Sequence, residues 1–179
     1  MEVPAPEGRR LDDRYRLELF RESEAVDEDA VIEMWTREGV LDEEHARERV
    51  RDVALVAVER EEGVVGVATT LLRNNPQLRM PLWTYRTFVS RAHRESDIAF
   101  LLLHTTRNHL RDRYVSGADT RGSGMVFEAQ DEVLKRGRQG LAVWKTSLFA
   151  FIGESVEGSH HRVYYFPGAL APPPPGGAA

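Results

Sequence analysis

The stretch VSRAHRESDIAFLLL, from Val89 to Leu103, decides how the chain folds. The alternating run Leu82–Ser90 is typical of a β-strand, and the apolar run that ends the stretch is too long and leucine-rich for another strand. These residues therefore predict a strand, an arginine-bearing turn and a buried helix. The N–H groups of such a turn and of the first helical turn are unpaired and carry a partial positive charge. If the chain binds a phosphorylated cofactor, we expect it at this turn.

The composition is that of a globular protein, and 179 residues allow one domain with a substantial core. The 24 basic and 29 acidic residues form no basic stripe with interleaved aromatics, so no nucleic-acid partner is indicated. The absence of cysteine excludes disulfides, thiolate chemistry and cysteine-bound metals, and it fits a reducing cytoplasm. No apolar run begins the sequence, so we expect neither a signal peptide nor a membrane anchor, and a cytoplasmic location.

The spacing of apolar residues predicts an alternation of hairpins and helices. The expected strands are residues 15–21, 54–60, 63–72, 82–90, 125–129, 147–154 and 161–167, and the expected helices are 28–38, one that begins at 42, 97–113 and 130–140. Residues 73–81 are expected to form a loop. Residues 1–13 are predicted to be a disordered leader, 14–168 a single domain, and 169–179 a disordered Pro- and Gly-rich tail. This order predicts an α/β (α+β) fold, a mixed sheet with helices on both faces.

Three motifs stand at fixed places in this order. A strand-to-helix turn of the form V-x-P-x-x-R-G-x-G-I-G/A is matched by Val89, Arg94, Ile98 and Ala99. An acidic-Gly turn before V-G is matched by EEGVVG at 61–66. A third motif, Y-x-x-x-G-F-x-x-x-G, is matched by WKTSLFAFIG at 144–153, through Phe149 and Gly153. Together with the element order, these motifs resemble the GNAT superfamily of N-acetyltransferases. The resemblance implies a mostly antiparallel central sheet of about seven strands, as in that family.

The resemblance also implies an activity, an acyl-CoA-dependent N-acyltransferase. The expected reaction is acetyl transfer from acetyl-CoA to a primary amine of a small molecule or peptide, by direct attack. In the family the turn binds the cofactor's pyrophosphate through backbone N–H groups, and the pantetheine pairs with the edge of the fourth strand. The corresponding residues are Phe88, Val89 and Ser90 on the strand, and Arg94, Glu95, Ser96, Asp97, Ile98 and Ala99 in the cradle. Arg91 and Arg94 are also expected to pair with phosphate oxygens.

Four positions depart from the family or bear on its chemistry, so the chain resembles a divergent member with a degenerate turn. Glu95 and Asp97 replace two turn glycines, which adds bulk and negative charge near the phosphates. Asp97 is alternatively a helix N-cap that occupies the same N–H groups. Trp144 stands where the family often has a proton-donating tyrosine, and an indole supplies no proton at neutral pH. Glu128 is the remaining carboxylate in a suitable place to deprotonate the amine.

These departures leave two further functions open. One is a GNAT-fold protein that has lost transfer activity and serves as a binding or interaction module. The other is an acyltransferase with a different donor, such as an acyl carrier protein or a longer acyl-CoA. The C-terminal hairpin strands are also suited to pairing across a homodimer.

The histidines do not indicate a metal site. His104 and His109 are five residues apart on a predicted helix, about 140° around its axis, so they cannot share one ion. His160 and His161 are adjacent near a hairpin turn, where successive side chains face opposite ways. His93 is expected to be either a solvated loop residue or a phosphate ligand.

Two other side chains have alternative roles. Trp35 is expected either to pack in the core or to line the acceptor pocket. Arg86, inside a strand, is expected either to line a cleft or to form an ion pair, because burying an unpaired guanidinium is costly.

Overall fold

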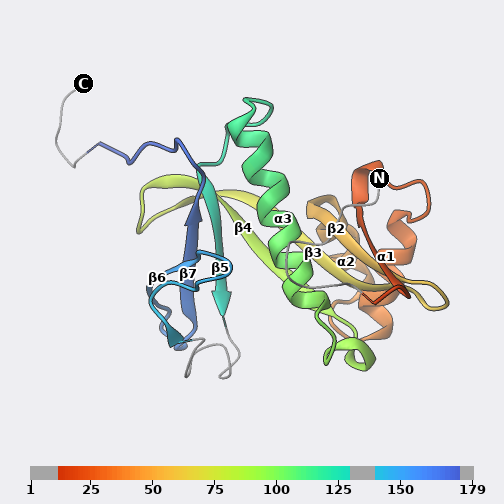
Figure 1. Ribbon diagram of the computed structural model, residues 1–179. Coiled ribbons are helices and arrows are strands. Elements are labelled where there is room, and N and C mark those ends of the chain that lie inside the picture. Colours follow the sequence, from red (N-terminus) through yellow and green to blue (C-terminus); the bar gives the residue numbers. More distant parts are fainter. Residues whose placement is uncertain (1–11, 130–139, 174–179) are drawn as a thin grey trace. The chain divides into compact units, whose positions relative to one another are not determined.

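The computed structural model describes residues 12–129 and 140–173 (Figure 1). Its strands are β1 (Tyr15–Leu19), β2 (Val53–Glu59), β3 (Gly63–Asn75), β4 (Met80–Val89), β5 (Gly124–Ala129), β6 (Ala150–Glu154) and β7 (His160–Tyr165). Its helices are α1 (Glu28–Arg37), α2 (Glu43–Arg49), α3 (Ile98–Val115) and the short 3-10 helices η1 (Phe20–Glu22), η2 (Val50–Asp52) and η3 (Arg91–His93). The strands form one seven-stranded sheet in the order β1-β2-β3-β4-β5-β7-β6.

The sheet is mostly antiparallel, which confirms the predicted fold class. The pairs β1–β2, β2–β3, β5–β7 and β6–β7 are antiparallel, and β4–β5 is parallel. The helix predicted at residues 130–140 lies almost entirely outside the described residues, so it stays a prediction. No helix in the described parts of the chain is both long and apolar enough to cross a membrane.

Three predicted boundaries are wrong, two of them for a local reason. The loop expected at 73–81 is mostly strand, because Asn75 closes a tight turn: its side chain accepts the N–H of Leu78 at 2.9 Å and its carbonyl that of Arg79 at 2.7 Å. The first strand ends at Leu19 and continues as η1. The strand expected from residue 147 begins at Ala150, because Leu148 has a positive φ of 58° that interrupts an extended chain.

Contacts divide the chain into two compact units. The described residues of the first are 12–70 and 86–108, and those of the second are 71–85, 109–129 and 140–173. The strands β3 and β4 and the helix α3 each continue from one unit into the other.

In the first unit, helices cover both faces of the strands. One face carries an apolar cluster that includes Trp35 of α1, Ala46 of α2 and Val56 of β2. Its α1 helix begins at an N-cap, Asp27, whose carboxylate accepts the N–H of Ala30 at 2.9 Å. On the other face, α3 packs against β2 and β3 through Ile98 and Leu102.

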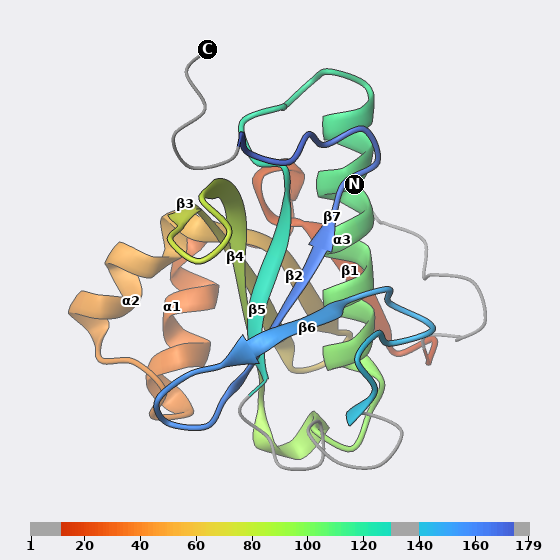
Figure 2. The same cartoon turned by 90° about the vertical axis from the view of Figure 1, so that its left-hand side faces the viewer.

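In the second unit, β5, β7 and β6 lie side by side (Figure 2). A small core joins Met80 and Leu82 of β4 to Val126 of β5 and Val163 of β7. A second, aromatic group packs around Phe127: its ring lies 5.6 Å from that of Trp144 and 5.0 Å from that of Phe149. These contacts are within the distances at which aromatic rings attract one another.

Candidate functional site

The predicted strand, turn and helix are present at Met80–Val115. After β4 ends at Val89, Ser90 is buried, and its N–H donates to the carbonyl of Val65 at 2.8 Å. The Ser90 carbonyl accepts the N–H of His93 at 3.0 Å, which closes η3. The His93 carbonyl in turn accepts the N–H of Ser96 at 3.1 Å. The turn is therefore a continuous series of main-chain hydrogen bonds from β3 to the start of α3.

The start of α3 lies close against β3 at Gly66. A Cβ atom at Gly66 would lie 3.0 Å from Ile98 Cγ2 and 3.2 Å from Leu102 Cδ1, which is closer than ordinary packing contacts. Ile98 and Leu102 are completely buried. A side chain at this position would push against Ile98 and Leu102, so a glycine favours the close approach of α3 to β3.

The N-terminal end of α3 carries main-chain N–H groups, the kind of hydrogen-bond donor that an anion needs. The Leu101 N–H donates to the carbonyl of Asp97, the residue before α3, at 2.9 Å. The Ile98 N–H reaches the Ser96 hydroxyl oxygen at 3.4 Å, which is a long hydrogen bond. A helix N-terminus carries a partial positive charge, so its donors favour a phosphate in this place. Phosphate binding by the predicted cradle stays a prediction.

The two arginines of the turn have different surroundings. Arg94 folds back on β4: its guanidinium lies 5.5 Å from the centre of the Phe88 ring, and its Nε donates to the Val89 carbonyl at 3.3 Å. The main-chain N–H of Arg91 donates to the Glu38 carboxylate at 3.2 Å. Both arginines are exposed, as their predicted contacts with phosphate require.

The two acidic replacements stand on ordinary backbone. Among the described residues other than glycine, only Arg79 and Leu148 have a positive φ, so Glu95 and Asp97 do not. Both acidic side chains are exposed. The turn therefore adopts its path without left-handed residues, and what the replacements change is charge and bulk. The predicted capping role of the Asp97 side chain stays a prediction.

The prediction that His93 is a solvated loop residue is wrong. Its side chain is 5% exposed, because the ring packs against Tyr15 of β1, with ring centres 5.5 Å apart. His93 Nδ1 lies 2.8 Å from the Tyr15 hydroxyl, and Nε2 lies 3.2 Å from Glu62 Oε2. Sequence reasoning missed this contact because nothing in a local pattern relates residues 78 positions apart.

The residues predicted to pair with the pantetheine, Phe88 to Ser90, come after the short stretch in which β4 pairs with β5. β4 pairs with β5 at two positions, Trp83 with Met125 and Thr84 with Val126. Phe88 is half-buried and Val89 is buried at the end of β4. Their predicted role stays a prediction.

Glu128, the predicted base, lies near the end of β5 in the second unit. It is the exposed residue of that strand, and its register partner on β7 is His161. Glu128 Oε1 lies 3.4 Å from His161 Nε2. A carboxylate beside an imidazole can accept a proton, directly or through water.

Trp144 belongs to a packed cluster rather than to an open site. It is 9% exposed, and the guanidinium of the completely buried Arg162 lies 4.2 Å from the centre of its ring. Arg162 also donates to the carbonyl of Leu141 at 3.0 Å, and burial lowers the pKa of its guanidinium. An arginine stacked on a tryptophan is a favourable pair when both are desolvated. The sequence showed no sign of this partner for Trp144.

The backbone angles of the segment before β6 agree with the glycine positions of the family motif. Leu148 stands at the position of the motif's first glycine, and its φ of 58° lies in the left-handed region that favours glycine. Phe149, the next motif residue, is completely buried. Gly153, the last, has a φ of 145°. This agreement supports the alignment of WKTSLFAFIG with the motif.

The remaining candidate residues give less support to a functional role. Trp35 is buried in the first unit's core, which agrees with the packing alternative. Arg86 is exposed and forms no ion pair with a described residue. Within residues 12–129 and 140–173, no group of three or more metal-binding side chains is arranged to hold an ion.

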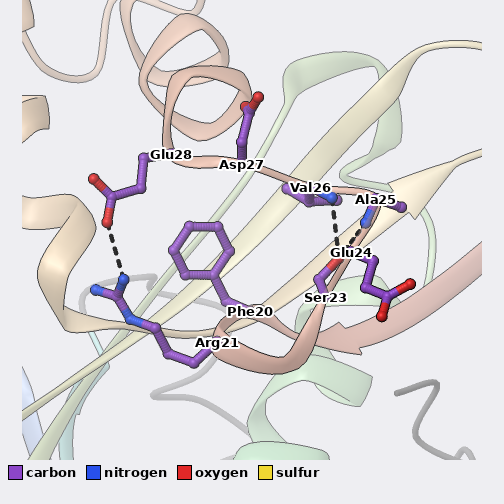
Figure 3. Close-up of a pocket in the computed structure, with 8 residues that line it drawn as sticks. All are labelled: Phe20, Arg21, Ser23, Glu24, Ala25, Val26, Asp27 and Glu28. Atoms are coloured by element: carbon purple, nitrogen blue, oxygen red, sulfur yellow. Dashed lines mark hydrogen bonds and ion pairs between the residues drawn. The ribbon is translucent and has the colours of Figure 1, made fainter.

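A hollow of about 360 Å³ lies between η1 and the start of α1 (Figure 3). Its polar groups are engaged with one another: Arg21 pairs with Glu28 at 2.9 Å, and the Ser23 hydroxyl accepts the N–H of Val26 at 3.0 Å. It shares no residue with the predicted site.

Solved structures share this fold, although no protein-family model matches the sequence and no curated protein matches it. A GNAT-family acetyltransferase from Bacillus anthracis superposes with a TM-score of 0.54 and 13% identity, over 92% of this chain and 98% of that one. A ribosomal-protein-S5-alanine acetyltransferase from Vibrio fischeri superposes with a TM-score of 0.55 and 10% sequence identity, over 95% of this chain and 99% of that one. A ribosomal L7/L12 alpha-N-protein acetyltransferase in complex with coenzyme A superposes with a TM-score of 0.52 and 11% sequence identity, over 93% of this chain and 98% of that one. The chain therefore has the GNAT fold.

Proposed function

We propose that this chain is an acyl-CoA-dependent N-acyltransferase that transfers an acetyl group from acetyl-CoA to a primary amine. The observation that carries the proposal is the strand, turn and helix at Met80–Val115, with α3 set against Gly66 and its N-terminal N–H groups beside the turn. A similar fold in an acetyltransferase solved with coenzyme A supports the same cofactor.

The proposed reaction needs little from the protein beyond orientation. The unprotonated amine attacks the thioester carbonyl, the new C–N bond forms, and the C–S bond breaks. The amine gives up one proton, for which Glu128 is the proposed acceptor, and CoA leaves as the thiol after gaining one. Arg91 and Arg94 are the proposed partners of the phosphates, and Arg94 would leave its position over Phe88 to reach them.

Calorimetric titration with acetyl-CoA tests the proposal. Binding with an increase in the melting temperature is the expected result, because a ligand that binds only the folded state stabilises it. An assay for released thiol with a panel of amines then tests transfer. No heat and no stabilisation at millimolar acetyl-CoA would refute the proposed cofactor.

A second candidate is a GNAT-fold protein without transfer activity. The surroundings of Trp144 favour it, since the residue at the usual place of the proton donor is buried against Arg162. Thiol release with any amine would exclude this candidate. A third, transfer from an acyl carrier protein or a longer acyl-CoA, would be supported by carrier binding without affinity for CoA.

A further inference from the structure

We infer that His93 is a positioning residue for the phosphate-binding turn, which it holds in place through hydrogen bonds to Tyr15 and Glu62. The inference rests on the proposed function, because it concerns how the turn presents its N–H groups to the cofactor. His93 itself lies outside the predicted cradle of residues 94–99.

Both ring nitrogens of His93 are engaged by residues from other elements. Glu62 follows β2 in the β2–β3 turn, and its carboxylate can only accept a hydrogen bond, so Nε2 carries the hydrogen across the 3.2 Å contact. In the neutral tautomer with its hydrogen on Nε2, Nδ1 accepts from the Tyr15 hydroxyl at 2.8 Å. Burial raises the pKa of Tyr15, which keeps this hydroxyl protonated and able to donate. One neutral tautomer of His93 satisfies both partners.

The partners of His93 are themselves held. Glu59, at the end of β2, accepts the N–H groups of Glu61 and Glu62 at 2.6 and 2.8 Å, which orders the turn that carries Glu62. The Arg14 guanidinium lies 4.6 Å from the centre of the Tyr15 ring. Tyr15 is 6% exposed within β1. The histidine is therefore attached to strand β1 through Tyr15 and to the β2–β3 turn through Glu62.

The fixed ring is connected to the first donor of α3 by a short path. The carbonyl of His93 accepts both the N–H of Ser96, at 3.1 Å, and the Ser96 hydroxyl hydrogen. The Ser96 hydroxyl oxygen in turn accepts the N–H of Ile98 at 3.4 Å. Releasing the ring would loosen Ser96 and the N–H groups after it, while α3 would still be held against β3 at Gly66.

The test compares CoA with pantetheine, which lacks the phosphates, on the full chain. His93→Phe fills the same space without ring nitrogens. It is expected to weaken CoA binding about tenfold, or ~1.4 kcal/mol, and to leave pantetheine binding unchanged. His104→Phe is the matched control, because His104 is equally buried in the same unit and stacks on Phe100, 3.9 Å between ring centres. This control is expected to change the affinity for neither ligand.

NMR titration measures both affinities and reports the amide signals of residues 94–99 directly. If His93→Phe does not fold, Tyr15→Phe and Glu62→Ala each remove one hydrogen-bond partner and are expected to weaken CoA binding selectively. Variants that bind CoA as the wild type does would overturn the inference and leave the proposed function intact. A wild type that does not bind CoA would overturn both. Equal losses for CoA and pantetheine would also overturn it, because they indicate a general structural role.

Discussion

The turn between β4 and α3 and the segment before β6 both depart from the family's sequence pattern, but with different consequences for the backbone. In the turn, Glu95 and Asp97 replace glycines without adopting a positive φ. Before β6, Leu148 replaces a glycine and keeps the left-handed conformation, with a φ of 58°. The path of the turn thus needs no glycine, whereas the segment before β6 needs a left-handed residue, a conformation that glycine adopts without strain.

The two regions also differ in how they are stabilised. The turn is held by hydrogen bonds around a buried histidine, and its exposed side chains remain available to a ligand. The segment before β6 is held by aromatic packing around Phe127, with Trp144 stacked under Arg162. The two regions are therefore stabilised by different interactions, and substitutions can test them separately.

The largest effect is expected at Arg162. Arg162→Ala removes a completely buried side chain and its stacking on Trp144, and should lower the free energy of unfolding by about 3 kcal/mol. Arg162→Met, which keeps the length without the charge, should cost less, because an apolar isostere needs no compensation for a buried cation. Urea unfolding measures both. An equal loss of unfolding free energy in Arg162→Ala and Arg162→Met would show that the volume of this side chain does not stabilise the cluster.

The next effect concerns the turn's charge. Replacing Glu95 and Asp97 together by glycine should strengthen CoA binding by about tenfold, or ~1.4 kcal/mol, because repulsion of the phosphates is removed. Calorimetry measures the change. Glu61→Gly, which removes one exposed acidic residue from the β2–β3 turn, controls for the loss of a negative charge outside the turn that precedes α3. Unchanged or weaker binding in the double variant would show that the acidic side chains do not oppose the cofactor.

A smaller gain is expected before β6. Leu148→Gly should stabilise the protein by about 1 kcal/mol, since it relieves the left-handed strain of a branched residue. The Leu148 side chain is 55% exposed, so little burial is lost. Chemical denaturation measures the difference, and Ala150→Gly serves as a control at a position without positive φ. A destabilised Leu148→Gly would indicate that this side chain packs in solution.

The smallest effect is a pH dependence at Glu59. Hydrogen bonds from the N–H groups of Glu62 and Glu61 hold the pKa of the Glu59 carboxyl below its usual value. A lowered pKa in the folded state favours folding above the ordinary glutamate pKa, and this contribution is lost as pH falls through the lowered value. The difference in urea midpoint between wild type and Glu59→Gln should shrink from neutral to acid pH. A difference that is equal at every pH would contradict this.

Much of the fold was predictable because it depends on local patterns. The alternation in Leu82–Ser90 and the leucines after Asp97 each mark an element from neighbouring residues alone, and so does Asp42, whose carboxylate caps α2 by accepting the N–H of His45 at 2.9 Å. The boundaries that were wrong depend on particular backbone angles, as at Leu148, or on a side chain that closes a turn, as at Asn75. Periodicity contains no information on either.

By itself the sequence determined the order of the strands and longer helices among the described residues, the strand, turn and helix around Val89 to Leu103, and the acidic replacements within that turn. Only the tertiary structure decided that His93 is buried between Tyr15 and Glu62, and that Trp144 lies beneath Arg162. The reason is physical: hydrophobic periodicity is a property of neighbours along the chain. The partners of a buried polar side chain, in contrast, come from whichever strands the fold brings beside it.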